Sequence, residues 1–122
     1  MTFLTKAQII QKALDGVLKQ GSLSKEDRSC NYWSNGLACG VGQLIPLELR
    51  NPEFDTPGDT GVLRMLKYED FRSALLAGGI DTSDWDIIQL LCDIQRFHDS
   101  AETVDEFKSK MEVMLSELGH EE

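Results

Sequence analysis

The first clear feature of the chain is a helical spacing of apolar residues that starts near its N-terminus. Residues Thr5-Lys6-Ala7-Gln8 match a capping box, in which the threonine oxygen accepts the Gln8 amide hydrogen and the glutamine side chain reaches back. Gly21 is suited to a left-handed helix end. We therefore predict a helix over residues 6–20, with an apolar face made by Ile10, Ala13, Leu14, Val17 and Leu18.

A second capping box, Thr103-Val104-Asp105-Glu106, opens the last predicted helix, and Gly119 is expected to end it. Its apolar residues are spaced three and four apart, which places them in one stripe: Val104, Phe107, Met111, Met114 and Leu118. Such a stripe packs on one neighbour, either another helix of the chain or a second copy of the protein. We favour the first, because a stripe of so few turns is shorter than most coiled coils.

Two further apolar segments lie in the second half of the chain. Residues 62–77 indicate one helix or two short ones, stopped by Gly78-Gly79. The next segment, about residues 84–99, is apolar on almost every side between Trp85 and Phe97. A helix of that kind is typical of the middle of a core, so we expect the other helices to surround it.

The pattern changes around residues 30–41, where Asn35-Gly36 favours a two-residue hairpin turn that sets Tyr32 opposite Cys39. A short helical segment is expected at residues 41–45, before a proline. The predicted fold is therefore mainly α. It is a compact bundle of four to five helices with a small β-hairpin near residues 30–41, in a single globular domain over residues 1–122.

Charge is unevenly distributed along the chain, whose formal net charge is -9. Residues 1–50 carry six Lys or Arg against four Asp or Glu, whereas residues 51–122 carry six against seventeen. Nucleic-acid affinity depends on neutralising phosphates, so we expect no direct nucleic-acid binding by the acidic half. That half is either a solubilising surface or a surface that meets a basic partner.

The N-terminal residues Met1–Lys6 lack a basic region followed by an apolar stretch, so we expect no secretory signal. No run approaches the roughly 18 apolar residues that a membrane span needs, and no membrane association is expected. The three cysteines, Cys30, Cys39 and Cys92, are then reduced thiols in a cytoplasmic compartment.

A small set of residues carries candidate chemistry: Cys30, Tyr32, Cys39, His98 and Asp99. In a hydrolase or transferase, Cys39 would be the nucleophile and His98 its base, with an amide-rich turn lowering the thiol pKa. Asp99 is poorly placed to orient His98, because adjacent helical residues point about 100° apart. This enzyme is our alternative function.

The same cysteines, with His98 and Asp99, are also possible zinc ligands. Eight residues separate Cys30 from Cys39, which is not the spacing of a zinc knuckle, so we predict no metal site. Glycine-rich nucleotide-binding motifs are absent as well, and we predict no cofactor. The plainest interpretation makes both cysteines small buried residues and His98 a hydrogen-bonded structural residue.

Three segments together resemble a group of small phage and prophage proteins. They are Cys30-x-Tyr32, the run Cys39-Gly-Val-Gly-Gln-Leu-Ile-Pro46, and the later pair His98-Asp99. The group carries a Cys-Ala-Val-Gly-His-Leu-Ile-Pro-like segment followed by a His-Asp pair. This chain has Gly40 and Gln43 where that pattern has Ala and His, which weakens any metal or catalytic role of the segment.

The resemblance implies a small acidic protein made in the cytoplasm of a bacterial host, where it binds and inhibits a host or defence component. A nucleic-acid-binding or defence protein is the expected partner, met either by the acidic second half, which contains Asp99, or by Tyr32 and Trp33 as aromatic anchors. A homodimer through the last helix and a pocket for a small nucleotide-like ligand are the other hypotheses.

Overall fold

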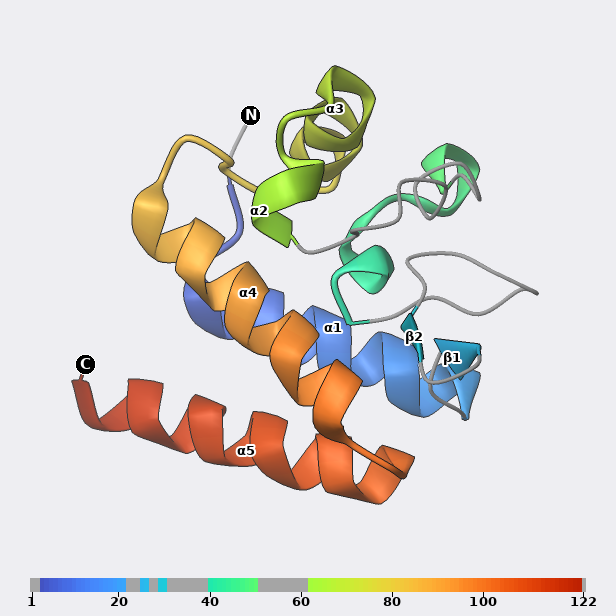
Figure 1. Cartoon of the computed structure of the whole chain (residues 1–122). Helices are drawn as coiled ribbons and strands as arrows, with labels where there is room; N and C mark the ends of the chain where they lie inside the picture. The colour runs from blue at the N-terminus through green and yellow to red at the C-terminus, as the bar shows by residue number, and fades with distance from the viewer. Residues whose placement is uncertain (1–2, 22–24, 27–28, 31–39, 51–61, 122) are drawn as a thin grey trace.

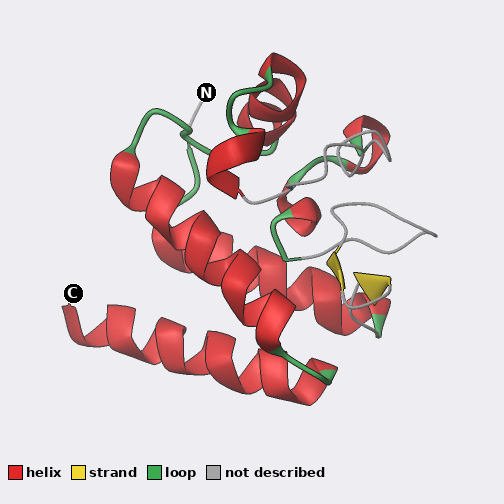
Figure 2. Ribbon diagram, in the orientation of Figure 1, coloured by secondary structure: helices red, strands yellow, loops and turns green. Residues whose placement is uncertain are grey.

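The structure is a computed structural model that describes residues 3–21, 25–26, 29–30, 40–50 and 62–121, and within these ranges it is mainly helical (Figures 1 and 2). The predicted mainly α class is confirmed. The α-helices are α1 (Lys6–Gln20), α2 (Val62–Met65), α3 (Glu69–Ala77), α4 (Trp85–Ser100) and α5 (Val104–Glu121). The smaller elements are the 3-10 helices η1 (Gly42–Leu44) and η2 (Leu47–Leu49) and the strands β1 (Lys25–Glu26) and β2 (Ser29–Cys30).

Helix α1 has the predicted bounds and the predicted caps. The Gln8 amide donates to Thr5 Oγ1 at 3.2 Å, and the Thr5 amide donates to Gln8 Oε1 at 2.9 Å. Gly21 ends the helix in the left-handed region, with φ 83°. The helix turns Ile9, Ile10, Ala13, Leu14 and Val17 into the core.

Helix α5 starts as predicted but ends later. Thr103 Oγ1 accepts the Glu106 amide at 3.1 Å, while the Glu106 carboxylate accepts the amide of Glu102, one residue earlier than a capping box has it. The helix continues through Gly119 to Glu121, so the predicted stop is wrong. A glycine inside a helix costs only about 1 kcal/mol, which continuing backbone hydrogen bonds offset.

The apolar stripe of α5 packs inside the chain, as favoured above. Phe107 and Met111 are fully buried, and Val104, Met114 and Leu118 pack against the same core. The neighbours of α5 are α1 and α4. The packing accounts for the stripe within one chain, and the homodimer through the last helix stays a prediction.

The segment of residues 62–77 forms two short helices, α2 and α3, which is one of the two predicted outcomes. Helix α4 is not surrounded in the way its sequence suggests. It contacts α1, α2, α5 and strand β2, and Figure 1 shows it lying across α1 and diverging from α5. Trp85, however, is 58% exposed, and Ile88 and Cys92 are half-buried. The elements that the structure describes do not cover the whole circumference of α4.

The predicted hairpin at residues 30–41 is not supported where its ends are described. Cys30 pairs with Lys25 in an antiparallel ladder between β2 and β1, and Val41 lies in a turn that leads into η1. Residues 31–39, with the predicted turn, lie outside the described residues. Val41 is fully buried in the helical core, so packing sets the conformation at this end.

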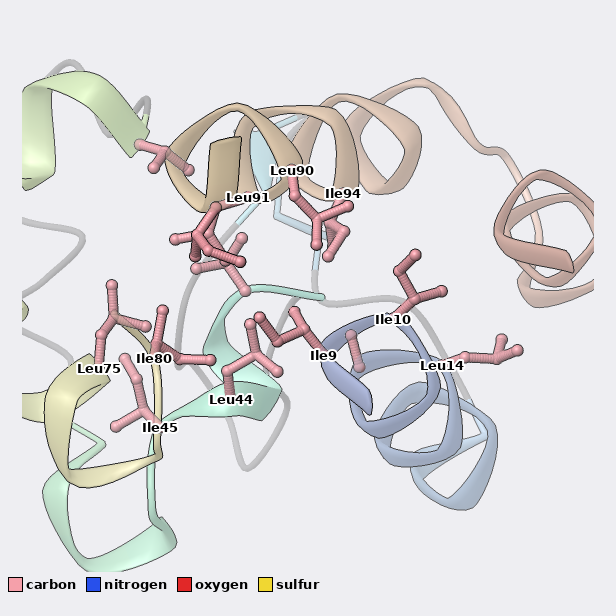
Figure 3. Packing of buried hydrophobic residues seen from close by; sticks show 14 of the residues in the cluster. Ile9, Ile10, Leu14, Leu44, Ile45, Leu75, Ile80, Leu90, Leu91 and Ile94 are labelled. Atoms are coloured by element: carbon pink, nitrogen blue, oxygen red, sulfur yellow. The ribbon is translucent and has the colours of Figure 1, made fainter. Parts of the chain in front are cut away.

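The core forms where η1 enters between the helices. Figure 3 shows Leu44 between Ile9 of α1 and Ile80, which follows α3, while Ile45 lies in the group with Leu75 and Ile80. These side chains are at most 1% exposed. The predicted helical segment at residues 41–45 is thus confirmed as the short helix η1 and its flanks, and its apolar side chains hold α1 and α3 together.

Candidate functional site

A row of apolar side chains runs along the uncovered side of α4. Trp85, Ile88 and Cys92 are three and four residues apart, so they share one helix face. Leu63 of α2, which is 54% exposed, stands beside them. With Gln89 and Asp93 they line a shallow hollow of about 310 Å³. We call this hollow the α2–α4 groove.

The start of α4 decides which residues face the groove. The Asp84 carboxylate accepts the Asp86 amide at 2.9 Å and caps the helix, so that Trp85 is its first residue. Ile87 and Ile88 then point about 100° apart around the helix. Ile87 is buried in the core, while Ile88 lines the groove.

Among the described residues that line the groove, Asp93 supplies the one carboxylate. Asp93 accepts a hydrogen bond from Arg96 at 2.7 Å, but this exposed pair contributes little to stability. Burial raises the pKa of the Cys92 thiol, Asp93 raises it further, and Arg96 lowers it by less. Cys92 therefore stays a protonated thiol at neutral pH, and the negative charge of Asp93 outweighs the positive charge of Arg96 at that point.

A second hollow, of about 210 Å³, lies next to the groove, between α4 and α5. It is lined by Lys6 of α1, by Asp86, Gln89 and Asp93 of α4, and by Met114 and Leu118 of α5. Asp86, Gln89 and Asp93 are again three and four residues apart, and we call this row the α4 ridge. Both ridge carboxylates line this second hollow, and Asp93 also lines the α2–α4 groove.

Two of the residues singled out from the sequence, His98 and Asp99, lie at the far end of α4. His98 is fully buried, with its ring edge-on to Phe107 at 5.7 Å between centroids. His98 Nδ1 lies 4.0 Å from Asp99 Oδ1, longer than a hydrogen bond, and Asp99 instead accepts from Gln95 at 3.1 Å. The two side chains diverge, as adjacent helical residues do, and Asp99 is not part of the groove.

Tyr32, Trp33 and Cys39 lie outside the described residues, as does the side chain of Cys30. The residue that follows Cys39 is placed, however: a Cβ added at Gly40 would lie 2.6 Å from Ile94 and 3.3 Å from Phe107. Gly40 and His98 therefore both lie near Phe107. The Cys39–His98 enzyme stays a prediction, and full burial presents neither His98 nitrogen to solvent.

The segment that carries the phage resemblance forms part of the core. Val41, Leu44 and Ile45 are buried, and the buried Gln43 donates from Nε2 to Gln20 Oε1 at 3.0 Å. Arg50 donates to the Ile45 carbonyl at 2.9 Å. The segment therefore stabilises the fold. The spacing of its apolar residues reflects their packing in the core.

The sequence contained an indication of the groove, but the nearly continuous run of apolar residues in α4 obscured it. Asp86, Gln89 and Asp93 interrupt a helix that otherwise looks apolar all round. Polar residues three and four apart mark a helix side that meets water. The apolar residues beside that row, Trp85, Ile88 and Cys92, are then the ones that a small bundle leaves uncovered.

Other classes of site find no support in the part of the chain that the structure describes. No three His, Cys, Asp or Glu side chains there are grouped so that they could hold a metal ion. None of the described helices combines the length and the apolar character required to span a membrane. A comparison with protein families, curated proteins and solved structures finds no match.

Proposed function

We propose that this chain is a small phage-type accessory protein that acts in the host cytoplasm by binding, and thereby inhibiting, a host or defence protein. The α2–α4 groove is its contact surface. The observation that carries the proposal is the exposed Trp85 beside Leu63 and Ile88, with the carboxylate of Asp93 in the same lining. Tryptophan is enriched among the residues that dominate binding energy, and the groove lies in the acidic half of the chain.

The exposed area is large enough to matter for binding. A tryptophan buries about 150–250 Å² when covered, and about half of that is still open at Trp85. At about 25 cal/mol per Å², covering Trp85 contributes about 2–3 kcal/mol. Leu63, which is 54% exposed, adds a smaller amount. One contact of this size is typical of the centre of a protein interface.

The test is affinity capture from bacterial lysate followed by measurement of the affinity of the purified captured protein. Trp85→Ala is compared with Val113→Ala, since Val113 on α5 is 59% exposed and lines neither hollow. We expect Trp85→Ala to weaken binding by about 10- to 100-fold and Val113→Ala by less than about 2-fold. Circular dichroism verifies that both variants keep the fold.

A third variant addresses the other binding surface predicted from the sequence. Trp33→Ala removes the aromatic anchor of residues 30–41 and leaves the groove intact. If Trp33→Ala abolishes capture while Trp85→Ala does not, the groove is not the contact surface. Equal binding by all three variants and the parent chain contradicts an aromatic anchor at either place.

A further inference from the structure

The carboxylates of the α4 ridge have a spacing that a helical partner can match. Asp86 and Asp93 are seven residues apart, which is two turns and about 10 Å along the helix axis. Both residues line the hollow on the α5 side of the ridge, and Asp93 lines the α2–α4 groove as well. A helix lying along α4 with basic residues seven apart would place each of them near one carboxylate.

The negative charge of α4 and α5 limits the kinds of partner that this surface can bind. Residues 85–121, which form α4, α5 and their connection, carry nine Asp or Glu against three Lys or Arg. A negative surface repels nucleic acid and anionic lipid, and it attracts Lys and Arg.

The same charge argues against a second copy of the chain in the groove. Each copy carries a net charge of -9, and a symmetric contact along α4 would bring the two ridges close together. Like charges in such a position cost several kcal/mol. An extended peptide is also disfavoured, because α2 and α4 wall the groove with helices and offer no strand edge for pairing.

Building on the proposed function, we infer that the α2–α4 groove receives a basic amphipathic helix of the partner protein. The apolar face of that helix packs on Trp85, Ile88 and Leu63. Its Lys or Arg side chains reach Asp86 and Asp93 on the ridge. Recognition combines an apolar stripe with cationic flanks, the chemistry of a helix-in-groove complex.

The fluorescence of Trp85 itself reports whether a peptide binds in the groove. In a Trp33→Phe background Trp85 is the only tryptophan of the chain, so its emission reports the groove. Three tryptophan-free peptides of about 18 residues are titrated: a Leu/Lys amphipathic helix, the same pattern with Glu for Lys, and the Lys peptide with a central proline. We expect the Lys helix to shift Trp85 emission to the blue and the other two to bind at least about 10-fold more weakly.

Two double variants, each of which removes two negative charges, test where the Lys helix binds. Asp86→Asn with Asp93→Asn removes two charges from the ridge, while Glu112→Gln with Glu117→Gln removes two from exposed positions of α5. We expect the first pair to weaken binding of the Lys helix by about 3- to 10-fold and the second by less than about 2-fold. Raising NaCl from about 50 to about 500 mM should reduce this difference.

The outcomes separate this inference from the proposed function. Equal affinity for the Lys and Glu helices, or equal effects of the two charge pairs, overturns the basic-helix inference even if the captured protein still requires Trp85. Dimerisation in sedimentation velocity that Trp85→Ala abolishes assigns the groove to a second copy and overturns it too. Capture that is insensitive to Trp85→Ala contradicts the proposed function itself.

Discussion

The Gly78→Ala variant is expected to be less stable than the parent chain, because the added Cβ displaces η1 from its position beside the end of α3. Gly78 follows α3, and a Cβ added there would collide with the carbonyl oxygen of Leu44 and lie 3.2 Å from the Leu44 carbonyl carbon. The nearest atom on the other side is the Leu75 carbonyl oxygen at 3.3 Å. All three are backbone atoms, so no side-chain rotation relieves the contact.

Two opposing effects set the expected change in the free energy of unfolding of Gly78→Ala. Gly78 has φ -84° and ψ 2°, which alanine adopts without strain, and the lower freedom of the unfolded chain then stabilises the variant by up to about 1 kcal/mol. Overpacking a filled interior costs about 1–3 kcal/mol, and a rigid carbonyl belongs at the upper end. We expect a net loss of about 2 kcal/mol, or about 5–10 °C in Tm.

Gly21→Ala is the matched control. Gly21 has φ 83°, but a Cβ added there has nothing within 4 Å, so the variant bears only the left-handed backbone penalty of about 1 kcal/mol. Urea unfolding followed by far-UV circular dichroism measures both variants. If Gly78→Ala is as stable as the parent chain, or loses less than Gly21→Ala, η1 is not seated against this turn.

Two further predictions concern single side chains. Because Asp93 and burial both raise the pKa of Cys92, alkylation by iodoacetamide in a Cys30→Ser, Cys39→Ser background should be slow at neutral pH and accelerate toward pH 10. Asp93→Asn should speed alkylation at a given pH, and an unchanged rate would contradict the assigned cause. Phe107→Ala, which empties a fully buried site, should cost about 3–5 kcal/mol in urea unfolding, against less than about 0.5 kcal/mol for the exposed Val113→Ala; similar losses would place Phe107 outside the core.

Features that depend on neighbours within one helical turn were predictable from the sequence. The capping box of Thr5 and Gln8 and the left-handed stop at Gly21 gave α1 both of its correct bounds. Thr103 likewise marked the start of α5. These interactions join residues at most four apart, so the local sequence contains both partners.

Tertiary packing decided what the local pattern left open. Whether α4 is covered on all sides depends on how many elements reach it, and α1, α2 and α5 leave Trp85 and Ile88 open. The sequence predicts residue 41 as the end of a hairpin and the start of a short helical segment, and burial of Val41 between the helices selected the turn into η1. Which apolar faces the described helices enclose depends on how they pack together, and no local pattern of residues contains that information.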